Sequence, residues 1–363
     1  MGLRTLPLTL VVFLIIQCGE ARAIPVFAHR YGLSCQTCHT AFPQLTPFGQ
    51  AFLRAGFRLP PTMPAHETFP ISVKANVQYS SAPEPQQLPK VILDELEFLS
   101  FASVTQHLSY RIEQYAVDGG SPGLTRDAWL SYTSRPDFGT TTAALRATAG
   151  QFTLPLPVDP ETQRWTLRHY AIFDQKVGAN PFNLFDDRIG LDAAFGRQIR
   201  GVDLHALALV GHDPQSGLPN LGTDTMFAAQ GAGAGVVFSL YRYDGRRPLG
   251  PVSDRFWRQA LSANVYVGKA EIDALAQMGH DSSADGMGSS VNSHGGFSQL
   301  IWSFSPALMG VTRYDTTYDA FAGPTTSVTT SLVIRLRSNM RLTVEGVTRK
   351  SGGSVNAAWL VAY

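Results

Sequence analysis

The chain has 363 residues, enough for one large domain or two ordinary ones. Charged residues make up 16% of it and hydrophobic residues 44%, a composition that excludes an intrinsically disordered chain. Lysine and arginine (29) nearly balance aspartate and glutamate (28), so the basic excess of a nucleic-acid-binding protein is missing and no nucleic-acid partner is expected. A mean hydropathy of −0.02 excludes a polytopic helical membrane protein but not a membrane β-barrel, because half of each barrel strand is polar.

Residues 1–23 have the three parts of a secretory signal peptide. Arg4 precedes the apolar run Val11–Ile16, and Ala21–Ala23 offers small residues for cleavage. The apolar run is too short for a permanent transmembrane helix, and no later segment has 18 consecutive apolar residues. We predict export and cleavage after residue 23. A lipoprotein anchored at Cys18 is the alternative, but the glutamine before that cysteine suits it poorly.

The run Cys35-Gln36-Thr37-Cys38-His39 has the attachment pattern of c-type haem. Cysteines three residues apart lie about one helical turn apart, so both thiols can add to the vinyl groups of one porphyrin. His39 then follows as the proximal iron ligand. A thioredoxin-like disulfide would need a surrounding βαβ pattern, and a zinc site would need about four ligands; the sequence shows neither. We predict one covalent haem c, held by Cys35 and Cys38 and ligated by His39.

A short helix is predicted after this motif. Thr46 is a suitable N-cap, and the proline that follows suits the first helical position. Phe48 and Phe52 are four residues apart and share a face, which would cover a haem edge or the rest of a small core. Arg54 or Arg58 would either pair with a haem propionate or remain a solvated charge.

The sixth iron ligand has several candidates. Met63, in the Pro-rich stretch Leu59–Pro64, is our first choice. His66 and His29 are the next candidates, and water or a residue from the rest of the chain is a further alternative. Methionine would raise the reduction potential of the haem and histidine would lower it. Residues 24–70 are predicted to form this mono-haem c-type module of short helices and loops.

Residues 71–363 have the pattern of β-strands. Apolar and polar residues alternate with a period of two, and turn-forming residues separate the segments. The clearest segments are Ile71–Tyr79, Leu261–Gly268, Leu300–Ser305, Val328–Leu336 and Met340–Glu345. This alternation fits a soluble sandwich, with its apolar face inward, and an outer-membrane barrel, with its apolar face toward lipid.

Three features favour the barrel. The region is long for one sandwich, and its length allows about 14–16 strands at roughly 20 residues per strand and turn. The last segment alternates to its end, with Trp359, Val361 and Tyr363 on one face. Aromatic residues near predicted strand ends would form an interfacial girdle: Tyr79, Phe152, Trp302 and Tyr318. We predict an all-β fold, an outer-membrane antiparallel β-barrel of about 14–16 strands over residues 71–363.

The least regular part of this region is Gly178–Gly235. Two polar, glycine-rich stretches, Pro214–Thr225 and Met278–Gly296, are predicted to be surface loops.

The run Ile24–Pro43, followed by Leu45, Phe48-Gly49 and Phe52, resembles the fused outer-membrane monohaem cytochrome c–porin family, which includes iron-oxidising outer-membrane cytochromes. The close match covers about the first forty residues after the signal peptide, and the barrel resembles the family in layout. The resemblance implies a haem module that plugs or caps a porin, with the haem on Cys35 and Cys38.

The expected function is electron transfer across the outer membrane, from an extracellular donor such as Fe(II) to a periplasmic c-type cytochrome. Inward-facing Glu95, Glu97 and Glu113 would make the lumen polar and favour cations. The alternatives are a porin with a structural or sensory haem, and a soluble periplasmic mono-haem cytochrome with a β-rich domain. No catalytic residue is predicted, because the sequence shows no Ser-His-Asp arrangement and no phosphate loop.

Overall fold

A computed structural model describes residues 26–41, 44–55, 57, 59, 70–81, 90–134, 143–160, 163–214 and 224–362. The predicted signal peptide, residues 1–23, lies outside these residues, as do Met63 and His66. In the described part of the chain, no helix is both long enough and apolar enough to cross a membrane.

The N-terminal region contains short elements only. They are α2 (Val26–Tyr31), α3 (Cys35–Cys38), β1 (His39–Ala41), β2 (Gln44–Leu45) and α4 (Pro47–Arg54). Helix α4 begins as predicted, because the Thr46 side chain accepts a hydrogen bond from the backbone N–H of Gly49 and Pro47 takes the first position.

The described strands close into one antiparallel barrel, made of sixteen long strands and the two-residue β6 (Ser121–Pro122). The expected 14–16 strands are therefore confirmed at the upper value. The barrel closes where β19 pairs with β3, with Trp359 opposite Val77. The long strands are β3 (Ile71–Ser80), β4 (Lys90–Ser103), β5 (Leu108–Asp118), β7 (Thr125–Thr133), β8 (Ala144–Thr153), β9 (Asp187–Ile199), β10 (Val202–His212), β11 (Asp224–Gly233), β12 (Val236–Leu249), β13 (Val252–Val267), β14 (Ala270–Asp281), β15 (Val291–Ser305), β16 (Leu308–Asp319), β17 (Gly323–Arg337), β18 (Met340–Arg349) and β19 (Gly352–Ala362).

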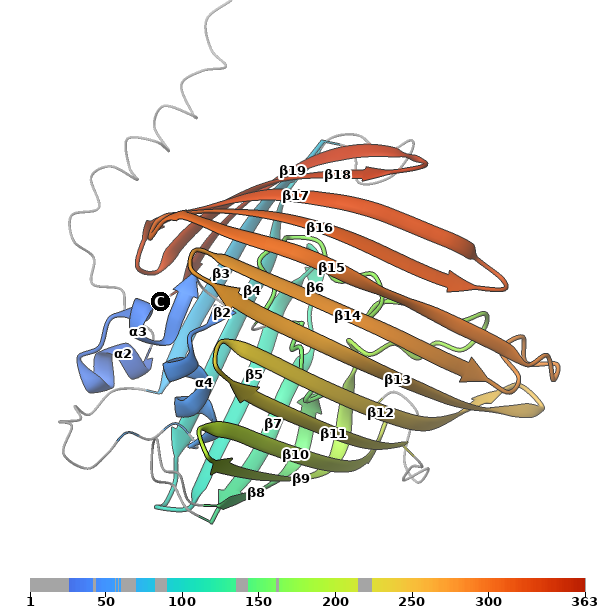
Figure 1. Ribbon diagram of the computed structural model, residues 1–363, viewed down its shortest axis with the longest axis horizontal. Coiled ribbons are helices and arrows are strands. Elements are labelled where there is room, and N and C mark those ends of the chain that lie inside the picture. Colours follow the sequence, from blue (N-terminus) through green and yellow to red (C-terminus); the bar gives the residue numbers. More distant parts are fainter. Residues whose placement is uncertain are drawn as a thin grey trace, which may run out of the picture.

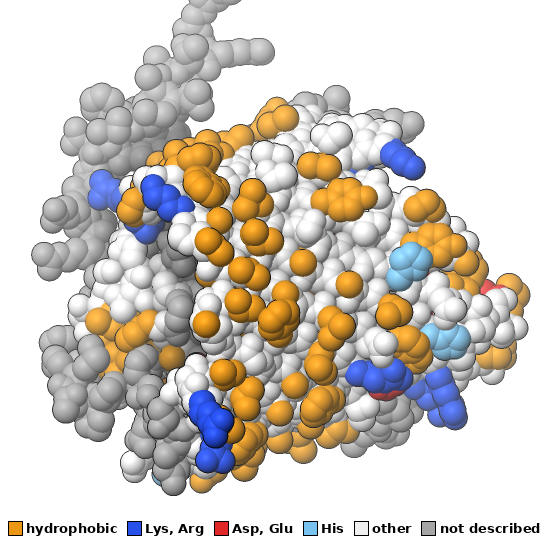
Figure 2. All heavy atoms as spheres, in the orientation of Figure 1, with side chains coloured by type: hydrophobic (Ala, Val, Ile, Leu, Met, Phe, Trp, Pro, Cys, Tyr) orange, Lys and Arg blue, Asp and Glu red, His pale blue; other side chains and the backbone are white. Residues whose placement is uncertain are grey.

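The barrel wall is polar inside and apolar outside. In β14, Asp273 and Gln277 are buried in the lumen, whereas Ile272 and Met278 are about half exposed on the outer face. Figure 2 shows hydrophobic side chains across the middle of one outer face, with the charged side chains near its ends. A soluble sandwich buries its apolar face instead, so the alternation seen in the sequence has the orientation of a membrane barrel.

Three members of the predicted aromatic girdle lie on the outer face, and one does not. Tyr79, Trp302 and Tyr318 are 37–44% exposed. Phe152 is only 4% exposed and packs inside the barrel. The period of two places Phe152 on the same face of β8 as the buried Thr148, so its assignment to the girdle was wrong.

The predicted irregular regions also need correction. Regular strands begin again at Asp187, so most of Gly178–Gly235 is sheet. The stretch Met278–Gly296 belongs to β14 and β15 at its two ends, and only residues 282–290 connect them. Some of its glycines serve close packing rather than turns, because a Cβ at Gly296 would overlap the carbonyl oxygen of Leu275 on the paired strand. Between β10 and β11, residues 215–223 lie outside the described chain.

The irregular segment is residues 154–186, the connection between β8 and β9, which we call the inner segment. It enters the barrel, where Figure 1 shows it as green coils behind the strands. Its apolar side chains are almost fully buried against inward-facing residues of β10 to β15. From the inner segment they include Leu154, Leu156, Tyr170, Ile172, Phe173, Phe182 and Leu184.

Helices α2, α3 and α4 lie at one end of the barrel, beside the C-terminal end of the chain (Figure 1). We call this end the module end. Five turns of two residues each lie at it, after β9, β11, β13, β15 and β17. The two longest connections, residues 154–186 and 213–223, start from the opposite end, where two further two-residue turns follow β12 and β18.

Candidate functional site

A cavity of about 270 Å³ joins the N-terminal region to the barrel lumen. Cys38 and His39 line it on one side, together with residues of α2 and α4. Inward-facing residues of β3, β4, β5, β18 and β19 and Arg126 of β7 line it on the other side. The inner segment contributes Arg164, Thr166, Leu167, His169 and Phe185. The cysteine–histidine motif therefore faces the lumen.

The main chain at Cys38 is held by Thr46 and α4. The Thr46 N–H donates to the carbonyl oxygen of Cys38 at 2.9 Å, and its hydroxyl donates to that of Thr37 at 2.7 Å. Gly49, one turn into α4, packs directly on Cys38, and a Cβ there would overlap the Cys38 carbonyl oxygen. The short pair of β1 and β2 sets His39 opposite Leu45. These contacts fix the direction in which the motif faces.

Aromatic rings attach this N-terminal region to the barrel wall. Phe57 is 7% exposed and packs on Phe101 of β4 at 5.3 Å between ring centroids and on Trp129 of β7 at 6.2 Å. Phe27 of α2 contacts Phe101 at 4.6 Å. Phe57 has a φ of 63°, a conformation unfavourable for a bulky residue, so its packing must outweigh that strain.

Ion pairs cover the lumen wall beside the motif. Lys74 contacts both Glu95, at 3.5 Å, and Glu97. Arg111 contacts Glu113 and, at 2.8 Å, Asp127. The three glutamates predicted to face inward do line the cavity. Each of them has a cationic partner, and Lys74 is shared by Glu95 and Glu97.

The residues predicted to hold the haem divide into those whose side chains the structure describes and those whose side chains it does not. Cys38 and His39 are half-buried and line the cavity. Cys35 begins α3 and His29 lies in α2, but their side chains, and that of Arg54, are outside the described part, as are Arg58, Met63 and His66. Among the described residues, no group of three or more His, Cys, Asp or Glu could hold a metal ion.

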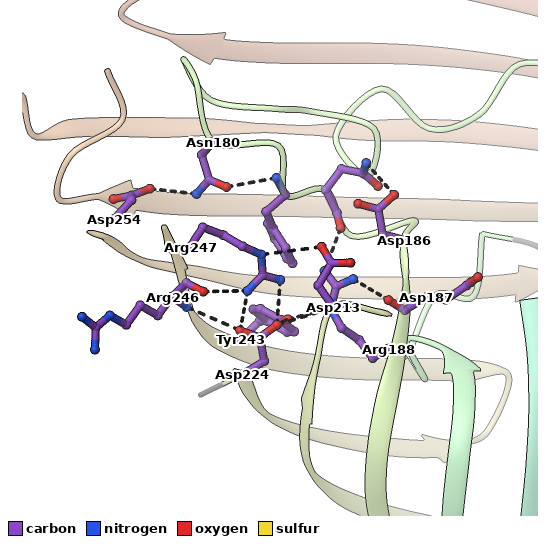
Figure 3. A network of polar contacts seen from close by, with 12 residues as sticks. Asn180, Asp186, Asp187, Arg188, Asp213, Asp224, Tyr243, Arg246, Arg247 and Asp254 are labelled. Carbon is purple, nitrogen blue, oxygen red and sulfur yellow. Dashed lines mark hydrogen bonds and ion pairs between the residues drawn. The ribbon is translucent and has the colours of Figure 1, made fainter. Parts of the chain in front are cut away.

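A polar network that was not predicted from the sequence fixes the inner segment to the barrel wall, as Figure 3 shows. Arg247 binds Asp224 through two hydrogen bonds of 2.7 Å, and Arg188 donates to the Tyr243 hydroxyl at 2.8 Å. Asn180 of the inner segment donates to Asp254 at 2.8 Å. These charged residues occupy inward positions of their strands, a pattern that the period of two could have identified.

Solved structures with this architecture are bacterial porins. The chain aligns with an anion-selective porin from Comamonas acidovorans at a TM-score of 0.59 and 10% identity, covering 81% of this chain and 98% of that one. OmpF of Salmonella typhi (TM-score 0.56, 10% identity, 81% and 97% covered) and the outer-membrane channel DcaP of Acinetobacter baumannii (0.56, 12%, 81% and 96%) are also similar. The fold is that of a porin. Neither a protein-family model nor a curated protein sequence matches the chain.

Proposed function

We propose that this porin-like barrel is an outer-membrane cytochrome c–porin fusion that carries electrons between an extracellular donor such as Fe(II) and a periplasmic c-type cytochrome. One observation carries the proposal: the haem-attachment motif opens onto a cavity whose other wall is the barrel lumen. A redox centre there would be in contact with both the barrel wall and the module end.

An outer-membrane location is supported by the outward apolar side chains and the porin fold. Such barrels have short turns on the periplasmic side and longer loops outside. Five of the seven two-residue turns between long strands lie at the module end, and the two longest connections start from the opposite end, which favours a periplasmic position for α2, α3 and α4. Electrons leaving that end would meet a periplasmic partner.

The residues around the cavity fit a haem c. Helix α3 is one turn long and ends at Cys38, so Cys35 and Cys38 are spaced to form the two thioether bonds, and His39 follows as the iron ligand. Aromatic side chains line the cavity next to the motif, as an apolar porphyrin requires. Bound haem would supply a one-electron iron couple, and the protein supplies ligation, burial and electrostatic environment. Met63 stays the first candidate for the sixth ligand.

The inner segment helps to distinguish electron transfer from the alternative function, a channel for small solutes. The porin fold favours passage of small solutes. However, the inner segment fills the side of the lumen facing β8 to β15 with tightly packed apolar residues, and the N-terminal region packs against the wall opposite. This filling is unfavourable for free diffusion of solutes, and an extracellular donor would approach the haem through the part of the lumen that the cavity beside the motif occupies. The soluble cytochrome alternative conflicts with the exposed apolar side chains.

The test uses the purified protein in detergent. Its intact mass should include one haem, and Fe(II) should reduce that haem, followed through its absorption bands. His39→Ala should abolish the low-spin spectrum. If the haem is attached but Fe(II) and other donors leave it oxidised in detergent and in liposomes, electron transfer is excluded and a structural or sensory haem remains.

A further inference from the structure

Two arginines on the cavity wall have unsatisfied guanidinium groups. Arg341, near the start of β18, is 7% exposed, and its Nε and Nη1 atoms have no hydrogen-bond partner among the described residues. The same holds for Nη1 of Arg164, in the inner segment. Both residues line the same cavity as Cys38 and His39.

The other cations of this cavity are paired with carboxylates. Lys74 has Glu95 and Glu97, Arg111 has Glu113 and Asp127, and Arg126 lies 3.4 Å from Asp187. Arg164 and Arg341 therefore differ from these three cations of the same cavity, each of which has a carboxylate partner.

The acids near enough to interact with Arg341 are already engaged. Glu345 accepts the N–H groups of Leu167, at 2.7 Å, and Arg168, at 3.0 Å, and the hydroxyl of Ser331. Glu95 is paired with Lys74. Arg164 is close enough to interact electrostatically with Arg341, and its positive charge opposes that of Arg341.

Two like charges in one cavity, with buried N–H groups unsatisfied, are costly unless an anion joins them. Guanidinium groups bind carboxylates with two parallel hydrogen bonds, so a ligand with two carboxylates would satisfy both. A haem carries two such groups, its propionates, on the porphyrin edge away from the thioether bonds. The motif and the two arginines line one cavity, so an attached haem could present that edge to them.

We propose that Arg164 and Arg341 bind the propionate carboxylates of the haem attached at Cys35 and Cys38. This inference rests on the haem of the proposed function. It gives the inner segment a second role, because Arg164 belongs to it: the segment fills the lumen and also holds the cofactor. The positive charges would favour the reduced, less positive iron and so raise the reduction potential.

The test compares Arg341→Met, Arg164→Met and Arg341→Lys with the control Arg337→Met, an exposed arginine at the same end of the barrel. Intact mass gives haem attachment, and a redox titration from pH 5 to pH 8 gives the potential. Either methionine variant should keep its haem and shift the reduction equilibrium about tenfold toward the oxidised state, which is 59 mV for one electron. The shift should depend on pH, because the released propionates would titrate. Arg341→Lys should shift less, and Arg337→Met should match the wild type.

Two outcomes would overturn the inference separately from the proposed function. If the haem is attached and its potential is unchanged in both methionine variants, the propionates lie elsewhere while the haem protein stands. If the wild type carries no haem, the proposed function fails too. A Cys35→Ser/Cys38→Ser variant, which cannot attach haem, tests whether the arginines bind a free anion instead. If succinate or phosphate stabilises this variant against unfolding, and adding Arg341→Met abolishes that effect, the arginines bind a soluble ligand and not the propionates.

Discussion

Arg313 of β16 donates a hydrogen bond of 2.8 Å from Nη2 to the main-chain carbonyl oxygen of His169 in the inner segment. The same guanidinium binds the Thr166 hydroxyl and the Arg168 carbonyl oxygen, and its Nε lies 2.8 Å from Asp315. Arg313 is fully buried. One side chain thus joins the barrel wall to three residues of the segment that fills the lumen.

We predict that Arg313→Ala destabilises the fold and loosens the inner segment. The substitution leaves Asp315 buried without its cation and removes the arginine donor from three acceptors, of which the Arg168 carbonyl oxygen keeps the Thr166 hydroxyl. A loss of about 3–5 kcal/mol in the free energy of unfolding is therefore expected. Urea unfolding in detergent measures the loss. In planar bilayers, the wild type should show little conductance, and the variant should show larger and more frequent open events.

Arg242→Ala is the matched control. Arg242 forms the same two-residue-spaced pair with Asp244, at 2.7 Å, but both side chains are more than 40% exposed. An exposed pair contributes about 1 kcal/mol or less. Equal losses in the two variants, or a wild type with the steady large conductance of an open pore, would contradict the role given to the inner segment.

Gly49→Ala is predicted to displace the main chain at Cys38. The added methyl group would overlap the Cys38 carbonyl oxygen, and backbone atoms cannot rotate away as a side chain can. We expect a several-fold lower yield of haem-loaded protein, measured as absorbance at the haem band per unit protein, with the barrel still folded. At Gly346 in β18, an added Cβ would meet open space. Gly346→Ala should therefore load haem as the wild type does.

Phe101→Ala is predicted to release the N-terminal region from the barrel wall. Phe101 contacts both Phe27 and Phe57, so its removal takes away most of the aromatic attachment. If the substitution weakens the packing of the N-terminal region on the barrel by about 1.4 kcal/mol, the population of molecules with this region released rises tenfold. Cleavage by a protease within residues 26–57 should accelerate by that factor or more. Phe98→Ala removes an outward-facing ring from the same strand and should leave the cleavage rate unchanged.

The sequence predicted features that depend on neighbouring residues. The period of two, the cap at Thr46 and the spacing of Cys35 and Cys38 are all local, and the strands and α4 followed from them. The inner segment has no such period. Its anchors are remote: Arg313 lies 144 residues from His169 along the chain, and nothing near either residue indicates the contact. Phe152 was misplaced for a related reason, because an aromatic residue near a strand end suits both a lipid interface and a filled lumen.

Lys74→Met is predicted to destabilise the barrel at the cavity, and a second substitution should restore part of the loss. Without Lys74, the buried Glu97 has no cation beside it, and a loss of about 3–5 kcal/mol in the free energy of unfolding is expected. Adding Glu97→Gln removes the uncompensated charge, so the double variant should be more stable than Lys74→Met alone. Lys269→Met, in an exposed turn, should change stability by less than about 0.5 kcal/mol. Urea unfolding followed by tryptophan fluorescence measures these three variants and Glu97→Gln alone. Additive losses from Lys74→Met and Glu97→Gln would mean that the two side chains do not interact, since coupled neighbours depart from additivity.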